Sequence, residues 1–282
     1  MAVLSSPASP SCAPAPGGNR RTRRDRLHQG IGILLLLAAI GQADAADMSA
    51  EQVAQALAQA SAGRPADFDG KDLSDLDLSR LDFRGARLHG TNLFASRLVL
   101  SNFAGADLRA ANLNGAWLMG TDFTGARLAG ASLLSVVILG GPVKAMPIFK
   151  GADLRGTKMI ADLPGADLSG ADLGAAHIGV EIKNQGMGQM RTDLTGAHLA
   201  GANLAGADLN RSLLSFADLR RSNLRGANLF RVKLVGADLT GADVTGADFT
   251  ESDLSDAILR DVTGLAQAKG LAGTESADKP VR

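Results

Sequence analysis

Apolar residues recur at every fifth position over most of the chain. From Leu194 to Leu259 this spacing holds for 14 consecutive units, each with a central Leu, Val or Phe that we call position i. Position i−2 is Ala, Ser, Thr or Val, position i−1 is mostly Asp or Asn, and Gly is frequent at i+2. An α-helix would space its apolar residues by three and four instead. The pattern therefore predicts a repeat array.

Two further stretches carry the same period. One runs from Phe68 to Ile138 in 15 units, and a shorter one from Leu154 to Ile178 contains a four-residue step between Met159 and Leu163. The segments near 140–149 (Gly140 to Phe149) and 179–190 (Gly179 to Met190) do not fit the period. We therefore predict two insertions and one slip in phase.

Strand geometry explains the period of five. Residues i−2 and i lie on one side of an extended segment, i−1 and i+1 lie on the other, and Gly at i+2 suits a turn with unusual backbone angles. Repetition of this unit produces a polygonal, all-β coil. Two columns repeat every 20 residues, which indicates four sides: Phe83, Phe103 and Phe123, and the alternating charges Asp67, Arg87, Asp107 and Arg127.

The A-[DN]-L-x-x pattern resembles that of the pentapeptide-repeat family. The resemblance covers about residues 67–260 and implies the right-handed quadrilateral β-helix of that family. The family has no single function. Its known members include DNA-mimicking proteins that protect gyrase, secreted bacterial effectors and many proteins without an assigned role.

Both open ends of such a stack need a cover. Within residues 46–66, Ser49 to Ala60 is predicted to form a helical N-terminal cap that begins with a capping box of Ser49 and Gln52. Residues 261–282 are predicted to hold a short C-terminal helix over Gly264–Gly270 and a disordered tail from Thr274. This C-terminal segment either caps the last coil or pairs with a second copy, which would make a homodimer through the C-terminal end.

Residues 1–45 are typical of a signal peptide. A block of five Arg between Arg20 and Arg26 precedes an apolar run from Ile31 to Ile40, and Ala43-Asp44-Ala45 provides an A-x-A site. A membrane-spanning helix needs about 20 residues, twice the length of this run. We predict cleavage near Ala45 and export to the bacterial periplasm or medium, with no stable membrane span afterwards. A retained anchor is the alternative, and the route, Sec or twin-arginine, stays open.

Charge narrows the range of partners. The 29 basic and 29 acidic residues of the whole chain become 24 and 27 once five Arg and two Asp leave with residues 1–45, a net charge of −3. This balance argues against nucleic acid as a partner and against mimicry of DNA, which needs a strongly negative surface. The only cysteine, Cys12, also leaves, so the mature chain would contain no disulfide.

No set of residues indicates catalysis. His89, His177 and His198 are far apart and fall on outward positions, without the spacing of metal ligands. The many Asp residues at i−1 are interpreted as the solubilising residue of the repeat rather than as carboxylate pairs for acid–base chemistry. We therefore assign no catalytic, cofactor-binding or metal-binding residue and expect a protein that is not an enzyme.

One face of the early coils carries apolar residues where polar ones are expected. They surround the only tryptophan of the chain: Val99, Leu100, Trp117, Met119, Val137 and Leu139. Exposed patches of this kind mark binding sites. Two interpretations stay open, because the patch either receives a partner or is covered by the segment Gly140–Phe149, which carries apolar residues of its own.

A second departure is basic. Arg191, Arg211 and Arg231 are 20 residues apart and should share one corner column that ends at Glu251. Stacked like charges repel, so the column either spreads into solvent or faces an anionic group. Both possibilities stay open.

Together these features predict a non-enzymatic, exported structural or interaction scaffold with an unidentified protein partner. A gyrase-protecting DNA mimic and a secreted effector are the alternatives. A carbohydrate-active β-helix would need a convergent set of cleft residues, and the sequence does not provide one.

Overall fold

The structure is a computed structural model of the chain, and it describes residues 46–61, 63–138, 145–180 and 191–271. The chain divides into two compact units at Asp44 and Ala45, and every described residue belongs to the second. The predicted signal peptide and the tail from Thr274 lie outside the described residues. Within the described ranges, no helix is long and apolar enough to cross a membrane.

Each five-residue unit satisfies its backbone N–H groups in a fixed way, as Ala202–Gly206 shows. The N–H of Asn203 donates to a carbonyl of the preceding coil, and those of Leu204 and Gly206 donate to the following coil, over 2.7–2.9 Å. The N–H of Ala202 closes a turn onto Leu199, 3.0 Å away. The N–H of Ala205 donates to the side-chain oxygen of Asn203 over 3.2 Å. Every N–H of the unit is therefore paired, as buried backbone requires.

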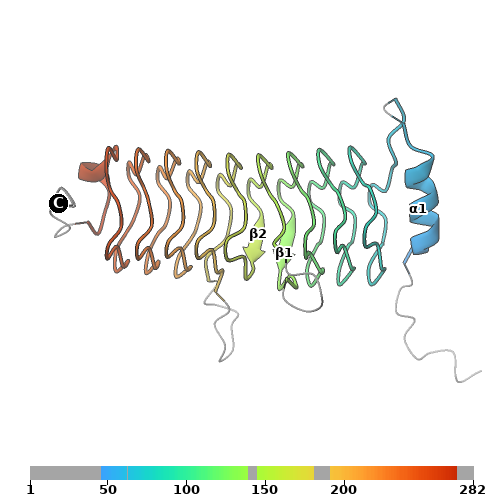
Figure 1. The fold of residues 1–282 in the computed structure, drawn as a ribbon, viewed down its shortest axis with the longest axis horizontal. Helices are drawn as coiled ribbons and strands as arrows, with labels where there is room; N and C mark the ends of the chain where they lie inside the picture. The colour runs from blue at the N-terminus through green and yellow to red at the C-terminus, as the bar shows by residue number, and fades with distance from the viewer. Residues whose placement is uncertain (1–45, 62, 139–144, 181–190, 272–282) are drawn as a thin grey trace, which may run out of the picture. The chain divides into compact units, whose positions relative to one another are not determined.

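Parallel bridges join residues of the same unit position in successive coils and define four faces. Most bridges connect residues 20 apart, so one coil contains four units, and Figure 1 shows the coils stacked along the chain. Face 1 starts at Asp67, face 2 at Asp72, face 3 at Asp77 and face 4 at Asp82. Face 3 carries two ladders, the first of Asp77, Arg97, Trp117 and Val137, and the second of Asp162, Asp193, Leu213, Lys233 and Asp253. The spacing of these bridges is the period of 20 residues on which the prediction of four sides rested.

Changes of register along the ladders locate the insertions and the slip. The step from Asp122 to Ile148 is 26 residues, the next step to Asp167 is 19, and the step from there to His198 is 31. The structure therefore contains the two predicted insertions and the missing residue. In the coil with the slip, β2 (Lys158–Ile160) pairs in parallel with β1 (Ser132–Leu134).

The first insertion is shorter than predicted. Phe149 is fully buried, and Ile148 belongs to the ladder of face 4, so the repeat resumes before Leu154. Phe149 extends the column of Phe83, Phe103 and Phe123, whose neighbouring ring centroids lie 4.5, 5.3 and 5.1 Å apart. The second insertion also begins later than predicted, because Val180 still bonds to Asn210 of the next coil.

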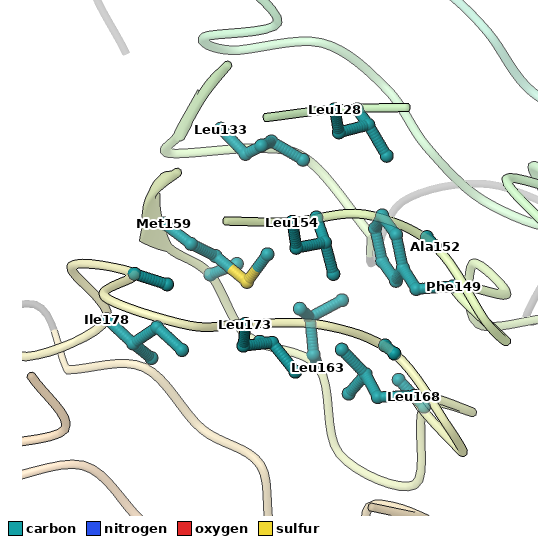
Figure 2. Close-up of a cluster of buried hydrophobic side chains, with 14 of the residues drawn as sticks. Leu128, Leu133, Phe149, Ala152, Leu154, Met159, Leu163, Leu168, Leu173 and Ile178 are labelled. Carbon is teal, nitrogen blue, oxygen red and sulfur yellow. The ribbon is translucent and has the colours of Figure 1, made fainter. Parts of the chain in front are cut away.

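The core is a column of central side chains inside the stack. In Figure 2, side chains from neighbouring coils, among them Leu154, Met159 and Leu173, point toward one another from different faces. The small residue at i−2 is buried as well, as at Ala152. Burial of each central Leu or Phe stabilises the fold by about 1.5–3 kcal/mol relative to its exposure to water.

Helix α1 (Ala50–Ala58) lies at the N-terminal end of the stack (Figure 1), and its predicted capping box is present. The Ser49 hydroxyl accepts the N–H of Gln52 at 3.2 Å, and the Ser49 N–H donates to the Gln52 side chain at 2.7 Å. Val53 is fully buried against the first coil. The Asp47 N–H also donates to the Asp72 carbonyl at 2.8 Å. The helix therefore covers the first coil.

The predicted C-terminal helix is only one turn of 3-10 helix, η2 (Leu265–Gln267). It follows Gly264, whose φ of 83° does not continue a helix, and it ends at the extended residue Ala268. The backbone instead continues the stack with one extra residue, because Lys269 bridges to Asp248, 21 residues before it. Ile258 and Leu265 stay 45% and 39% exposed, so the last coil presents apolar side chains.

Candidate interaction surface

Face 1 carries the predicted ladder of alternating charge. Arg87 lies 3.1 Å from Asp67, and Arg127 lies 3.4 Å from Asp107, each pair linking neighbouring coils. Arg109 also forks onto Asp107 within one unit, with contacts of 2.7 Å to both carboxylate oxygens. The Arg109 fork, together with Arg127, lowers the pKa of the Asp107 carboxyl. Such exposed pairs contribute about 0.2–1 kcal/mol each, so face 1 is a solvated, charge-balanced surface.

Face 3 contains the apolar residues around the tryptophan. Trp117 bridges to Arg97 on one side and Val137 on the other, so the three side chains share one column. The Arg97 guanidinium lies 4.7 Å from the centre of the Trp117 ring, and it also approaches Asp77 at 3.7 Å. Cation–π contacts of this kind contribute about 0.5–1 kcal/mol at exposed sites. One face of the Trp117 ring is therefore already occupied within the chain.

The patch around Trp117 is narrower than predicted. Met119 is 2% exposed and therefore does not present a surface, whereas Leu100 is 37% exposed. Trp117, Val99 and Val137 are half-buried, and Leu139 lies outside the described residues. Beyond the insertion, the Ala145 carbonyl accepts the N–H of Gly120 at 2.7 Å. The described end of the segment that was one of the two candidates to cover the patch therefore packs at the edge of the patch, and residues 139–144 lie outside the described residues.

The predicted arginine column lies at the corner between faces 2 and 3. Arg211 and Arg231 stand one coil apart, Arg211 half-buried and Arg231 exposed, and both have left-handed φ angles, 60° and 57°. Arg231 pairs with Glu251 at 2.7 Å and lies 4.9 Å from the centre of the Phe230 ring. Arg191 is exposed. At the C-terminal end of the column, Arg231 is therefore paired with a carboxylate.

Two exposed aromatic residues escaped the sequence analysis. Phe216 is 67% exposed at the corner between faces 3 and 4, and Phe94 is 48% exposed on face 2. The Phe216 ring lies over Gly236 of the next coil, where a Cβ atom would come within 2.7 Å of two ring carbons. The signal in the sequence was Phe at a position outside the core, i+1 for Phe94 and, for Phe216, i+2, the position that usually holds Gly.

Asp162 is an exception among the carboxylates of face 3. In the other units, an Asp at i−1 accepts the N–H of the residue two positions later, as Asp193 does from Thr195 at 2.8 Å. Asp162 is followed by Pro164, which has no N–H. Burial and the neighbouring Asp193 raise the pKa of Asp162. The middle of face 3 therefore carries a carboxylate that its own unit does not stabilise.

The three predicted outward histidines are exposed and lie on different faces. His177 belongs to the ladder of face 2 and His198 to that of face 4, whereas His89 follows Leu88 on face 1. Among the residues that the structure describes, no three His, Cys, Asp or Glu side chains are arranged to hold a metal ion.

The five-residue units and their parallel bridges agree with the family to which the sequence of this chain matches. The family model for pentapeptide repeats matches eight copies, within residues 66–93, 101–133, 190–226 and 227–263. The chain belongs to the pentapeptide-repeat family. No curated protein matches it.

Several solved structures are similar to the chain. HetL, a pentapeptide repeat protein involved in heterocyst differentiation regulation in the cyanobacterium Nostoc sp. strain PCC 7120, is 29% identical. The match covers 79% of this chain and 98% of HetL, with a TM-score of 0.32. Full-length QnrB1, a plasmid-mediated fluoroquinolone resistance protein, is 20% identical over 73% of this chain and 88% of its own, with a TM-score of 0.23. A pentapeptide repeat protein from the Arabidopsis thaliana thylakoid lumen is 32% identical over 38% of this chain and 72% of its own, with a TM-score of 0.19.

Proposed function

We propose that the chain is an exported, non-enzymatic scaffold, a right-handed quadrilateral β-helix that binds a protein partner through face 3. The observation that supports this proposal is the distribution of apolar ladder residues. The i−1 position is polar or charged throughout faces 1 and 2 and is apolar twice on face 4, at Ile148 and Ile258, whereas face 3 carries Trp117, Val137 and Leu213 there. Clustered surface apolar residues are typical of interfaces.

The position of the folded unit supports the proposed export. The second compact unit begins at Ala45, the last residue of the A-x-A site, and Asp47 already bonds to the first coil. Cleavage after Ala45 would leave all the described residues, which begin at 46, in the mature chain. Fractionation of the native host, followed by N-terminal sequencing, tests the proposal. We expect a chain that begins at Ala46 in the periplasm or medium, and an uncleaved chain confined to the cytoplasm would contradict it.

Binding through face 3 is tested by affinity capture from the compartment in which the protein resides. A Trp117→Asp variant should lose the captured partner, whereas an Arg127→Asp variant on the opposite face 1 should keep it. If both variants captured the partner equally well, face 3 would be excluded as the binding surface. The DNA-mimicking alternative is less well supported, because the ladder of face 1 alternates Asp with Arg from Asp67 to Arg127 and contains Asn203 and Asn223 further on, rather than presenting a continuous acidic surface.

Pairing of two copies through the C-terminal end is a separate proposal. The exposed side chains of Ile258 and Leu265 on the last coil support it. Light scattering after size exclusion should give twice the chain mass for the mature protein and one chain mass for an Ile258→Asp variant. A monomer at micromolar concentration would exclude the homodimer.

A further inference from the structure

Buried hydroxyl groups at position i−2 distinguish one coil from the rest of the stack. In the described part of the chain, eight Ser or Thr side chains are buried at i−2. Six of their hydroxyls donate to backbone carbonyls at 2.7–3.1 Å, those of Thr91, Ser96, Ser101, Thr121, Thr157 and Thr192. The hydroxyls of Ser212 and Ser222 are buried with no hydrogen-bond partner there. Both of these serines belong to the coil 211–230.

The two unpaired hydroxyls lower the stability of their own coil. A hydroxyl that leaves water without gaining a new partner destabilises the state that buries it. Ala, the commonest residue at i−2, would fill the same place without an unpaired polar atom. The unfolded coil would hydrate both hydroxyls, so Ser212 and Ser222 favour opening of the coil over its closed form.

Corners of the same coil are strained as well. Phe216 and Arg221 have left-handed φ angles of 60° and 55°. Residues with a Cβ atom adopt this conformation at a cost, and Gly adopts it freely. The flanking coils carry Gly at the matching corners, Gly196 and Gly236 beside Phe216, and Gly201 and Gly241 beside Arg221. The coil 211–230 is therefore less stable than the coils on either side of it.

The coil 95–114 shows that strained corners alone do not distinguish the coil 211–230. It has three left-handed corners with a Cβ atom, at Ala95, Leu100 and Ala110. Ser96 and Ser101 directly follow two of these corners, as Ser222 directly follows Arg221. Their hydroxyls, however, donate to backbone carbonyls at 2.7 Å. The coil 95–114 is thus a matched comparison in which the buried hydroxyls are paired.

We infer that the coil 211–230 is a built-in opening point, at which the C-terminal coils separate from the rest of the stack. In a solenoid each coil contacts only its two neighbours, so a weak coil opens without the unfolding of distant coils. Opening would release the N–H groups of Leu194, Leu199 and Leu204, which now donate to this coil over 2.7–2.8 Å. An edge of unpaired donors is a template for pairing with a further strand.

Hydrogen–deuterium exchange of the full chain, followed peptide by peptide with mass spectrometry, tests this opening. The exchange rate of a protected amide reports the equilibrium between the closed and the locally open coil. We expect a step of about tenfold or more between the slower coil 191–210 and the faster coil 211–230. The coil 95–114 should exchange as slowly as the coil 191–210. A gradual rise toward the C-terminal end, or equal rates in the coils 95–114 and 211–230, would overturn the inference.

Two double variants test whether the unpaired hydroxyls cause the opening. Ser212→Ala with Ser222→Ala removes both hydroxyls and should slow exchange within the coil 211–230 about tenfold, without changing the coil 95–114. The matched control, Ser96→Ala with Ser101→Ala, removes paired hydroxyls and should slow exchange in neither coil. Both double variants introduce the commonest residue at i−2, so the fold should be retained. Unchanged or faster exchange in the first double variant, or slower exchange in the control, would contradict the assigned cause.

Discussion

Within a unit, the N–H at i+1 has no carbonyl acceptor in either neighbouring coil, and the Asp or Asn at i−1 accepts it. Asp122 accepts the N–H of Thr124 at 2.8 Å, and Asn203 accepts that of Ala205 at 3.2 Å. The side chain thus replaces a backbone acceptor, as in other local motifs of Asp and Asn. The preference of the repeat for these two residues follows from this hydrogen bond.

Replacement of Asp122 tests that role. Asp122→Ala leaves the Thr124 N–H without its acceptor and should lower the free energy of unfolding by about 0.5–1.5 kcal/mol. Asp122→Asn keeps the acceptor oxygen and should be close to neutral. Urea unfolding followed by circular dichroism measures both. Equal losses in the two variants would show that charge, rather than the hydrogen bond, is what the position provides.

The corner residue at i+2 must adopt a left-handed φ angle. Ala110 has a φ of 56° and is exposed, so Ala110→Gly relieves strain without removing a contact. The gain should be up to about 1 kcal/mol, the left-handed cost of a Cβ atom less the extra entropy of Gly in the unfolded chain. Ala104→Gly, one position before a corner, should instead destabilise by about 0.5–1 kcal/mol. Urea unfolding measures the stability of both variants. A lower stability of Ala110→Gly would contradict the argument that Ala110 is strained.

The sequence predicted the roles of single residues within the unit only in part. Gly at i+2 correctly predicted a left-handed corner, because Gly is the residue that adopts it freely. Asp at i−1 was interpreted as a solubilising residue, and its hydrogen bond was missed, because the pattern does not show which N–H lacks an acceptor until the coils are stacked. Phe216 was missed for a related reason: a residue at i+2 attracts attention only after the corner geometry is known.

Whole faces, rather than single units, determine how the core packs. On face 4, Phe103 stacks between Phe83 and Phe123, with centroid distances of 4.5 and 5.3 Å. Phe249 is equally buried, but none of the aromatic contacts in the described part of the chain involves it. Stacked rings contribute about 0.5–1.5 kcal/mol beyond their burial.

These two phenylalanines form a matched pair. Phe103→Leu and Phe249→Leu remove similar volume, and Leu is the common central residue of the repeat. Phe103→Leu should cost about 1–2 kcal/mol more, because it also loses two stacking contacts. Guanidinium unfolding midpoints of the two variants measure the difference. Identical losses would mean that burial alone accounts for the column.

The ends of elements were harder to predict than their existence. Phe149 was assigned to an insertion because no regular unit precedes it, although its burial in the stack places it in the aromatic column. Met119 was predicted to face solvent from its position at i+1, but it is buried at the edge where Ala145 returns to the stack. The helix over 264–270 shrank to one turn, because contacts with the previous coil outweighed the weak helix preference of a short Ala-containing segment.

Across the whole molecule, aspartates with lowered pKa values couple folding to pH. The hydroxyl and N–H of Thr245 lower the pKa of Asp243 to about 2, and the Ser255 hydroxyl, with Lys233, lowers that of Asp253 to about 2. A lowered folded-state pKa stabilises the fold above the ordinary value of about 4, and this stabilisation is lost as the pH falls toward 2. Acid should therefore weaken the stack between these limits.

Urea midpoints measured from pH 7 to pH 2 test this coupling. We expect a constant midpoint down to about pH 4 and a steady fall below it. A double variant, Asp243→Asn with Asp253→Asn, should show a shallower fall, because two of the coupled carboxyls are gone. A midpoint that rises below pH 4 would contradict the assigned direction of the pKa shifts.

The overall architecture was the most predictable feature, because period five and the two columns of period 20 are independent signals of the same coil. The candidate interaction surface was less predictable from the sequence. Trp117 and the arginine column were found as departures from the repeat, but their surroundings depend on which residues the insertions bring back to the stack.

The 20-residue coil underlies every statement about faces, and the distance between residues of one ladder tests it most directly. In a Cys12→Ser background, pyrene can be attached to Asn203→Cys with Asn223→Cys, which are ladder neighbours, or to Asn223→Cys with Lys233→Cys, which lie on opposite faces. Bridge partners are about 4.8 Å apart, so the first pair should give strong excimer fluorescence in the folded chain. The second pair, although closer in sequence, should give none until urea unfolds the protein. Excimer emission from the second folded pair, or its absence from the first, would contradict the four-sided coil.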